Sequence, residues 1–267
     1  MPKYQTLMPI KTKGSLPALF CVHGEPLKMA MRIKADRPVY GLSHVYHASF
    51  QETIAETIEE LAGQYLDDVY KVCPEGPYHL LGFSAGAMVA YEMARQLIES
   101  GREVHSMVLI EPPLGKQANR IGGKREHLQG YVQESGWNLR TIGYLLQRIC
   151  KSIVARSVNL VSRVRVAILL RLGKDIPEDL RWLGYLRALG PAIGRYDYPP
   201  IGCPATLVYR ELDDDAKAVI DEFWTRLLGA AVELRYEDGA FSHGDFMLDP
   251  HLSNIGRLLD AAVAPGA

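Results

Sequence analysis

Short apolar segments alternate with longer amphipathic ones along most of the chain. The short segments are typical of strands, and they occupy residues 19–22, 38–42, 78–81, 107–110, 205–209 and 231–236. The longer ones carry apolar side chains at helical spacing and predict helices at residues 50–72, 87–97, 215–228 and 252–263. All of these short segments except 231–236 lack charged side chains, which is typical of strands in sheets buried on both faces. The alternation therefore predicts an α/β fold, with a mostly parallel sheet covered by helices on both sides.

The alternation breaks between residues 116 and 196. Within this stretch, residues 139–172 interleave apolar positions with arginines, which predicts one or two amphipathic helices. Packing of these helices against the rest of the protein is the simpler interpretation, and binding to a membrane surface is the alternative.

Charge marks the same boundaries. Residues 116–196 carry 15 basic and 5 acidic side chains. By contrast, residues 1–115 carry 10 basic and 13 acidic side chains, and residues 197–267 carry 5 basic and 13 acidic ones. The sequence thus predicts a core formed by residues 1–115 and 197–267, with residues 116–196 inserted as a separate helical unit.

Composition limits the classes of function. The chain has 267 residues, of which 48% are hydrophobic, and its net charge of −1 gives no indication of a nucleic-acid partner. Its four cysteines lie far apart without the paired spacing of a metal site, as expected for a reduced, cytoplasmic protein. We also expect no signal peptide in the first ten residues and no membrane-spanning segment.

The most informative motif is Gly82-Phe83-Ser84-Ala85-Gly86. A predicted strand precedes it and a predicted helix follows it, which is the setting of a nucleophile elbow. Glycines on either side allow strand and helix to approach closely, and the serine occupies the strained turn between them. This pattern predicts Ser84 as a catalytic nucleophile.

A serine hydroxyl needs a histidine to accept its proton and a carboxylate to orient that histidine. In hydrolases with this elbow, the chain order is serine, acid, histidine. His243 lies in a loop after the last predicted strand, where the base is expected, and His251 lies at a helix start, where a structural role is expected.

Two places could supply the acid. Glu111 ends the strand after the elbow helix and is followed by two prolines, which restrict its freedom. Asp213, Asp214 and Asp215 follow the next strand, but acids that open a helix often serve only to cap it. We favour Glu111 and keep the aspartates as the alternative.

A tetrahedral oxyanion needs two backbone amide donors. Ala85, directly after the nucleophile, is expected to supply one. Glu25 is expected to supply the other, because it follows the first apolar strand and Pro26 has no amide hydrogen. His23, before them, is expected to shape this loop.

The segments 16–24 and 38–42, the elbow 82–86 and the late His243 together resemble the thioesterase domains that end polyketide and nonribosomal peptide assembly lines. The resemblance implies an α/β-hydrolase fold with a helical lid at 116–196. It implies an acyl chain held as a thioester on the phosphopantetheine arm of a carrier protein, and no cofactor of the enzyme's own. Position by position, it assigns Ser84 as nucleophile, His243 as base and Glu111 as acid.

The chain departs from that family in two respects. Glu111 stands where the family usually has Asp, as in the curacin-type thioesterases that hydrolyse β-sulfated acyl chains and yield terminal alkenes. Gly24 and Pro38 are separated by only 13 residues, which is short for a glycine-rich turn plus a helix.

Four functions therefore stand as hypotheses from the sequence. The first is release of an acyl or peptidyl chain by hydrolysis or cyclisation, and the second is the curacin-type reaction. The third is editing of stalled carrier proteins by a stand-alone thioesterase. The fourth is a non-catalytic binding module with a hydrolase fold.

Overall fold

The computed structural model describes residues 6–43, 55–115, 189–239 and 241–262, together with a few isolated residues between 164 and 180. Most of the predicted insert 116–196, including the amphipathic helices expected at 139–172, lies outside these described residues. The structure therefore does not test the predicted lid.

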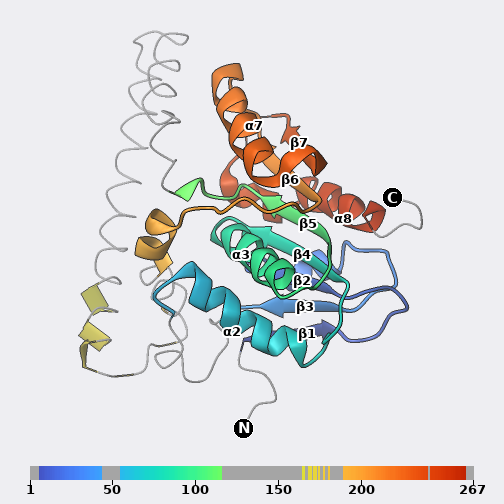
Figure 1. Cartoon of the computed structure of the whole chain (residues 1–267), viewed down its shortest axis with the longest axis vertical. Coiled ribbons are helices and arrows are strands. Elements are labelled where there is room, and N and C mark those ends of the chain that lie inside the picture. Colours follow the sequence, from blue (N-terminus) through green and yellow to red (C-terminus); the bar gives the residue numbers. More distant parts are fainter. Residues whose placement is uncertain are drawn as a thin grey trace, which may run out of the picture.

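A seven-stranded sheet forms the centre of the core (Figure 1). Its strand order is β1-β3-β2-β4-β5-β6-β7, in which β1 pairs antiparallel with β3 and all other neighbours are parallel. The strands are β1 (Leu7–Lys11), β2 (Leu19–Val22), β3 (Val39–Leu42), β4 (Tyr78–Phe83), β5 (Val104–Ile110), β6 (Ala205–Arg210) and β7 (Val232–Glu237). The predicted parallel sheet is confirmed. The edge strand β1 was not predicted, because Pro9 and Lys11 interrupt its apolar pattern.

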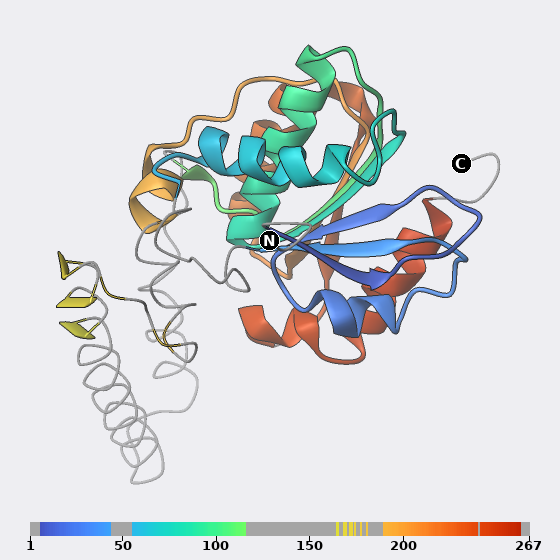
Figure 2. The same cartoon turned by 90° about the horizontal axis from the view of Figure 1, so that it is seen from below.

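Helices cover both faces of this sheet (Figure 2). On one face lie α2 (Ile58–Tyr70), α3 (Ala85–Glu99) and α7 (Asp214–Leu228), and on the other lie α1 (Pro26–Ala30) and α8 (His251–Ala261). Successive strand residues alternate between the two cores. Phe20 packs with the α3 side, for example, while Leu19 and Cys21 pack with the α8 side.

Helix α2 begins later than predicted. The sequence pattern placed its start at residue 50, but Ala55–Thr57 are not helical and the helix begins at Ile58. Thr57 caps it, since the Thr57 hydroxyl accepts a hydrogen bond from the Glu60 amide at 3.1 Å. Apolar periodicity before a cap does not require a helix, and here the cap decided the boundary.

Helix α3 packs unusually close to the strands beneath it. A Cβ atom at Gly82 would lie 2.4 Å from Ala87 Cα, and one at Gly86 would lie 2.2 Å from the Val22 carbonyl oxygen. Neither contact is sterically possible, so only glycine fits at these two positions. The close approach fixes where the first turn of α3 sits above β2 and β4.

Tyrosines join the chain on either side of the predicted insert to the core. Tyr198 donates a hydrogen bond to the Pro113 carbonyl at 2.7 Å, so the chain leaving β5 and the chain returning toward β6 lie side by side. Tyr196 donates to the buried carboxylate of Glu92 in α3, also at 2.7 Å. Arg95 and Gln96 satisfy the remaining acceptor sites of Glu92. The chain at the end of the insert is thus bonded both to the elbow helix α3 and to the loop that precedes the insert.

Two glycine-to-alanine substitutions test the role of close packing. Gly86→Ala should destabilise the fold by about 2–3 kcal/mol, because its Cβ would collide with the Val22 backbone. Gly63→Ala, in the middle of α2, is the matched control. Its Cβ would meet Gln96 Oε1 at an ordinary 3.7 Å, so the better helix propensity of Ala should stabilise by about 0.5–1 kcal/mol. Thermal unfolding measures both, and equal effects would contradict the packing argument.

Candidate active site

The predicted site residues gather at one edge of the sheet. Ser84 directly follows β4, Glu111 directly follows β5, and Glu25 lies three residues beyond β2. His243 begins the 3₁₀ turn η4 (His243–Met247), which comes after β7. The carboxyl ends of parallel strands share one edge, which is where open α/β sheets bind their ligands.

Ser84 occupies the strained turn expected of a nucleophile elbow. Its φ is 54° and its ψ is −124°, a region that side-chain-bearing residues rarely adopt. The Ser84 amide donates to the Ile110 carbonyl at 2.8 Å, and its own carbonyl accepts from Ala87 at 2.9 Å. These bonds hold the turn in place at the start of the 15-residue helix α3.

His243 and Glu111 are in direct contact, although 132 residues separate them in sequence. The His243 Nδ1 atom hydrogen-bonds Glu111 Oε2. A histidine that donates through Nδ1 leaves Nε2 free to accept a proton, as a general base requires. The ring also stacks on Phe83, the residue before Ser84, with 4.7 Å between centroids and 20° between planes.

The Ser84 turn lies close to this pair, because Phe83, which stacks on His243, is the residue before Ser84. Within the residues the structure describes, no hydrogen bond joins Ser84 to the His243 ring. Such bonds are often long in the absence of substrate and tighten when substrate binds. The structure thus brings Glu111 and His243 into contact and places the Ser84 turn near the His243 ring.

Glu111 is held as a carboxylate. Its side chain is 9% exposed, and burial by itself would raise its pKa. Hydrogen bonds from His243 and Arg210, together with their charges, outweigh burial and bring the pKa below its ordinary value. Glu111 also has a positive φ of 43°, which marks a second constrained turn at the sheet edge.

Arg210 was not predicted from the sequence. It is the last residue of β6, and its Nε donates to Glu111 Oε1 at 2.5 Å. An arginine at the end of a strand has many possible roles. Only the pairing of β5 with β6, with Ile110 opposite Val208, brings it beside Glu111.

The alternative acid and base have structural roles, as the sequence patterns indicated. Asp213 caps α7, since its carboxylate accepts from the Ala216 amide at 2.8 Å. His251 begins α8, where it lies 3.1 Å from Glu237 and stacks on Phe241. Within the part of the chain that the structure describes, neither residue forms a hydrogen bond or ion pair with Glu111 or His243.

The two predicted oxyanion donors follow the neighbouring strands β4 and β2. Ala85 is the first residue of α3, where amides have no acceptor within the helix. Glu25 is the N-cap of α1, in a turn that packs against the elbow strand. A Cβ at Gly24 in that turn would lie 3.3 Å from Phe83 Cβ.

His23 shapes the Gly24–Glu25 turn, as expected from its position in the sequence. It is buried at a positive φ of 59°, and its Nε2 lies 2.9 Å from the Tyr65 hydroxyl. The short segment between Gly24 and Pro38 accommodates the five-residue helix α1 directly after this turn.

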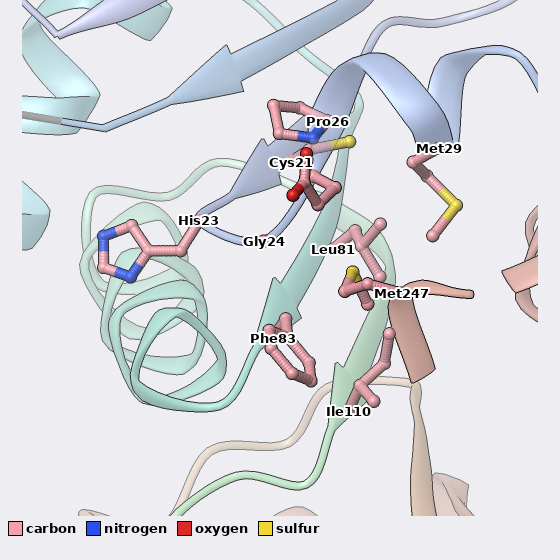
Figure 3. A pocket seen from close by; sticks show the side chains of 10 residues that line it. Cys21, His23, Gly24, Pro26, Met29, Leu81, Phe83, Ile110 and Met247 are labelled. Atoms are coloured by element: carbon pink, nitrogen blue, oxygen red, sulfur yellow. The ribbon is translucent and has the colours of Figure 1, made fainter. Parts of the chain in front are cut away.

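A pocket lies between this turn and the sheet edge (Figure 3). Its walls are mostly apolar and include Phe83 and Ile110 from the strands, Met29 from α1 and Met247 from η4. The turn that carries Glu25 and the 3₁₀ turn that begins at His243 therefore border the same apolar pocket.

Comparison with known proteins identifies the family. A model of the thioesterase domain matches residues 27–240, which is most of the chain. This chain belongs to the thioesterase domain family.

The curated relatives are much longer proteins. The chain is 36% identical over 118 residues to malpinin synthetase from Mortierella alpina, over 41% of this chain and 2% of the synthetase. It is 36% identical over 111 residues to a dimodular nonribosomal peptide synthase from Bacillus subtilis, over 39% of this chain and 5% of the synthase. It is 35% identical over 141 residues to the B. subtilis polyketide synthase PksR, over 51% of this chain and 5% of the synthase.

Solved structures agree in fold. The NocB thioesterase domain, in covalent complex with a fluorophosphonate nocardicin G analog, matches with a TM-score of 0.64 and 23% identity, over 97% of this chain and all of that one. A four-domain nonribosomal peptide synthetase, holo-AB3403, matches with a TM-score of 0.65 and 19% identity, over 98% of this chain and 20% of that one. The predicted α/β-hydrolase fold is confirmed.

None of the described helices is long and apolar enough to cross a bilayer. Among the described side chains, no cluster of three or more His, Cys, Asp or Glu could hold a metal ion.

The lowered pKa of Glu111 makes a prediction about stability. A carboxyl with a folded-state pKa below its ordinary value of 4.5 stabilises the folded state at higher pH. This contribution is lost as the pH falls through the folded-state pKa. Thermal unfolding from about pH 6 to about pH 3 should therefore show a steeper loss of stability for the wild type than for Glu111→Gln. Glu75→Gln, which removes an exposed acid outside the site, is the control, and parallel curves for wild type and Glu111→Gln would refute the prediction.

Proposed function

We propose that this protein is a serine thioesterase that releases an acyl or peptidyl chain from the phosphopantetheine arm of a carrier protein. The observation that carries the proposal is the Glu111–His243 pair beside the strained Ser84 turn, in a chain of the thioesterase domain family. The relatives named as nonribosomal peptide and polyketide synthases support a carrier-bound substrate. No cofactor beyond that arm is required.

In the proposed reaction, Ser84 Oγ attacks the thioester carbonyl while His243 Nε2 accepts the hydroxyl proton. Glu111 stabilises the imidazolium that forms, and the Ala85 and Glu25 amides donate to the oxyanion. Collapse of the intermediate breaks the carbon–sulfur bond, and the protonated His243 gives its proton to the departing thiolate. The acyl group on Ser84 is then attacked either by water, which gives hydrolysis, or by a nucleophile of the acyl chain itself, which gives cyclisation.

A narrower reaction is favoured by one observation, the glutamate at the acid position. In this second candidate, the thioesterase hydrolyses a β-sulfated acyl chain, and decarboxylation with loss of sulfate leaves a terminal alkene. Comparing β-sulfated with β-hydroxy acyl carriers tests it. A terminal alkene from the sulfated substrate supports the narrower reaction, and equal rates without alkene rule it out.

Substitution of the proposed triad is the direct test. Ser84→Ala and His243→Ala should each lower the turnover of an acyl-carrier substrate by about 10³-fold or more, because triad members act as a unit. Glu111→Gln should also be severely impaired, whereas Asp213→Asn should remain close to wild type because Asp213 only caps α7. Intact-protein mass spectrometry should detect an acyl group on Ser84. Near-normal turnover in Ser84→Ala would contradict the mechanism.

The basic character of residues 116–196 makes a separate prediction. If these side chains attract an acidic carrier protein or the phosphate of its arm, kcat/KM for a carrier-bound thioester should fall steeply with added salt. A small uncharged ester should be nearly insensitive over the same range. The same salt dependence for both substrates would show that the basic residues do not guide the carrier.

A further inference from the structure

We infer that Arg210 is a positioning residue that orients Glu111 toward His243, an inference that rests on the proposed function. The Glu111 carboxylate is divided between two partners. Its Oε2 atom faces His243 Nδ1, and its Oε1 atom accepts from Arg210 Nε at 2.5 Å. The Arg210 backbone amide lies 3.4 Å from the same Oε1. One oxygen is therefore held by β6 while the other holds the base.

The length of the glutamate side chain explains why this second contact matters. Glutamate has one more rotatable bond than aspartate, so a glutamate orients a histidine less tightly unless its far oxygen is fixed. At 9% exposure, little water can reach Glu111 to replace a lost donor. The rigid, charged guanidinium provides a strong directional hydrogen bond for this purpose.

The other charged and titratable groups around this contact have partners of their own. The Tyr209 hydroxyl lies 3.3 Å from the Pro112 carbonyl and accepts a hydrogen bond from Trp224. Glu237, which is opposite Arg210 in the sheet, holds His251 and Asn254, and Glu211 pairs with Lys217. Glu111 is thus the carboxylate that Arg210 holds in the described part of the chain.

Arg210 also places a positive charge beside the Glu111–His243 pair, and this charge is one of the causes that bring the pKa of Glu111 below its ordinary value. A nearby cation favours the deprotonated form of such a pair. Removing the cation should therefore favour protonation within the pair and lower activity at the acid end of the pH–rate profile.

Two variants separate charge from geometry. Arg210→Met removes both, so kcat should fall about 10–100-fold while KM changes little, and the acid limb of the pH profile should move to higher pH. Arg210→Lys keeps the charge but loses the planar Nε contact, so kcat should fall while the acid limb stays near its wild-type position. If both variants keep wild-type kcat and the wild-type pH profile, the inference is wrong.

Arg235→Met is the matched control. Arg235 lies on the neighbouring strand β7 and pairs with Glu233 at 2.7 Å, so this variant removes a similar arginine–glutamate pair away from the site. Its kcat and pH profile should match the wild type. Thermal unfolding of every variant shows whether a loss of activity reflects a loss of fold.

A double-mutant cycle with Glu111→Gln tests whether Arg210 acts through the acid. If it does, adding Arg210→Met to Glu111→Gln should change single-turnover rates less than about twofold. If Arg210→Met lowers the single-turnover rate by the same factor in both backgrounds, Arg210 contacts substrate or supports the fold, and the inference is overturned. Full activity in Ser84→Ala or Glu111→Gln would instead overturn the proposed function itself. The two failures are therefore distinguishable.

Discussion

The close packing of α3 on β2 and β4 is the constraint on which the site depends. The first turn of the helix approaches the strands so closely that Gly82 and Gly86 admit no side chain. The chain between them must then turn sharply, and Ser84 takes the positive φ that this turn requires. The same geometry starts α3 at Ala85, which directs its first amides toward the sheet edge. Strain at one residue is thus maintained by packing at two others.

Parallel strand pairing then brings distant segments to this edge. Glu111 follows β5, Arg210 ends β6, and His243 lies in the 3₁₀ turn after β7, so the three come together because these strands are neighbours. On the other face, Arg32 after α1 pairs with Asp249 after η4, with 2.5 Å between Nη2 and Oδ2. This contact joins the segment after the Glu25 turn to the segment after the His243 turn.

The buried carboxylates described here each accept hydrogen bonds from several donors, and they either connect structural elements or form part of the candidate site. Asp68 accepts from the Thr6 and Leu7 amides and thereby attaches β1 to α2. Glu92 accepts from Tyr196 and Arg95 and anchors the returning chain on α3. Each has donors that compensate for lost hydration, as buried charges require. Glu111 likewise accepts hydrogen bonds from Arg210 and His243, but here one donor, His243, is also the proposed general base.

The sequence by itself determined the alternating elements, the sharp turn at Ser84 and the chain order of the predicted nucleophile, acid and base, because these depend on local pattern and chain order. It also favoured Glu111 over Asp213, since a capping role for an acid at a helix start can be inferred locally. Only the tertiary structure decided the start of α2, the edge strand β1 and the place of Arg210. A cap competes with apolar periodicity, and an edge strand has a weak pattern of its own. The Arg210–Glu111 contact depends on which strands become neighbours, and no local pattern encodes a pairing between residues 99 positions apart.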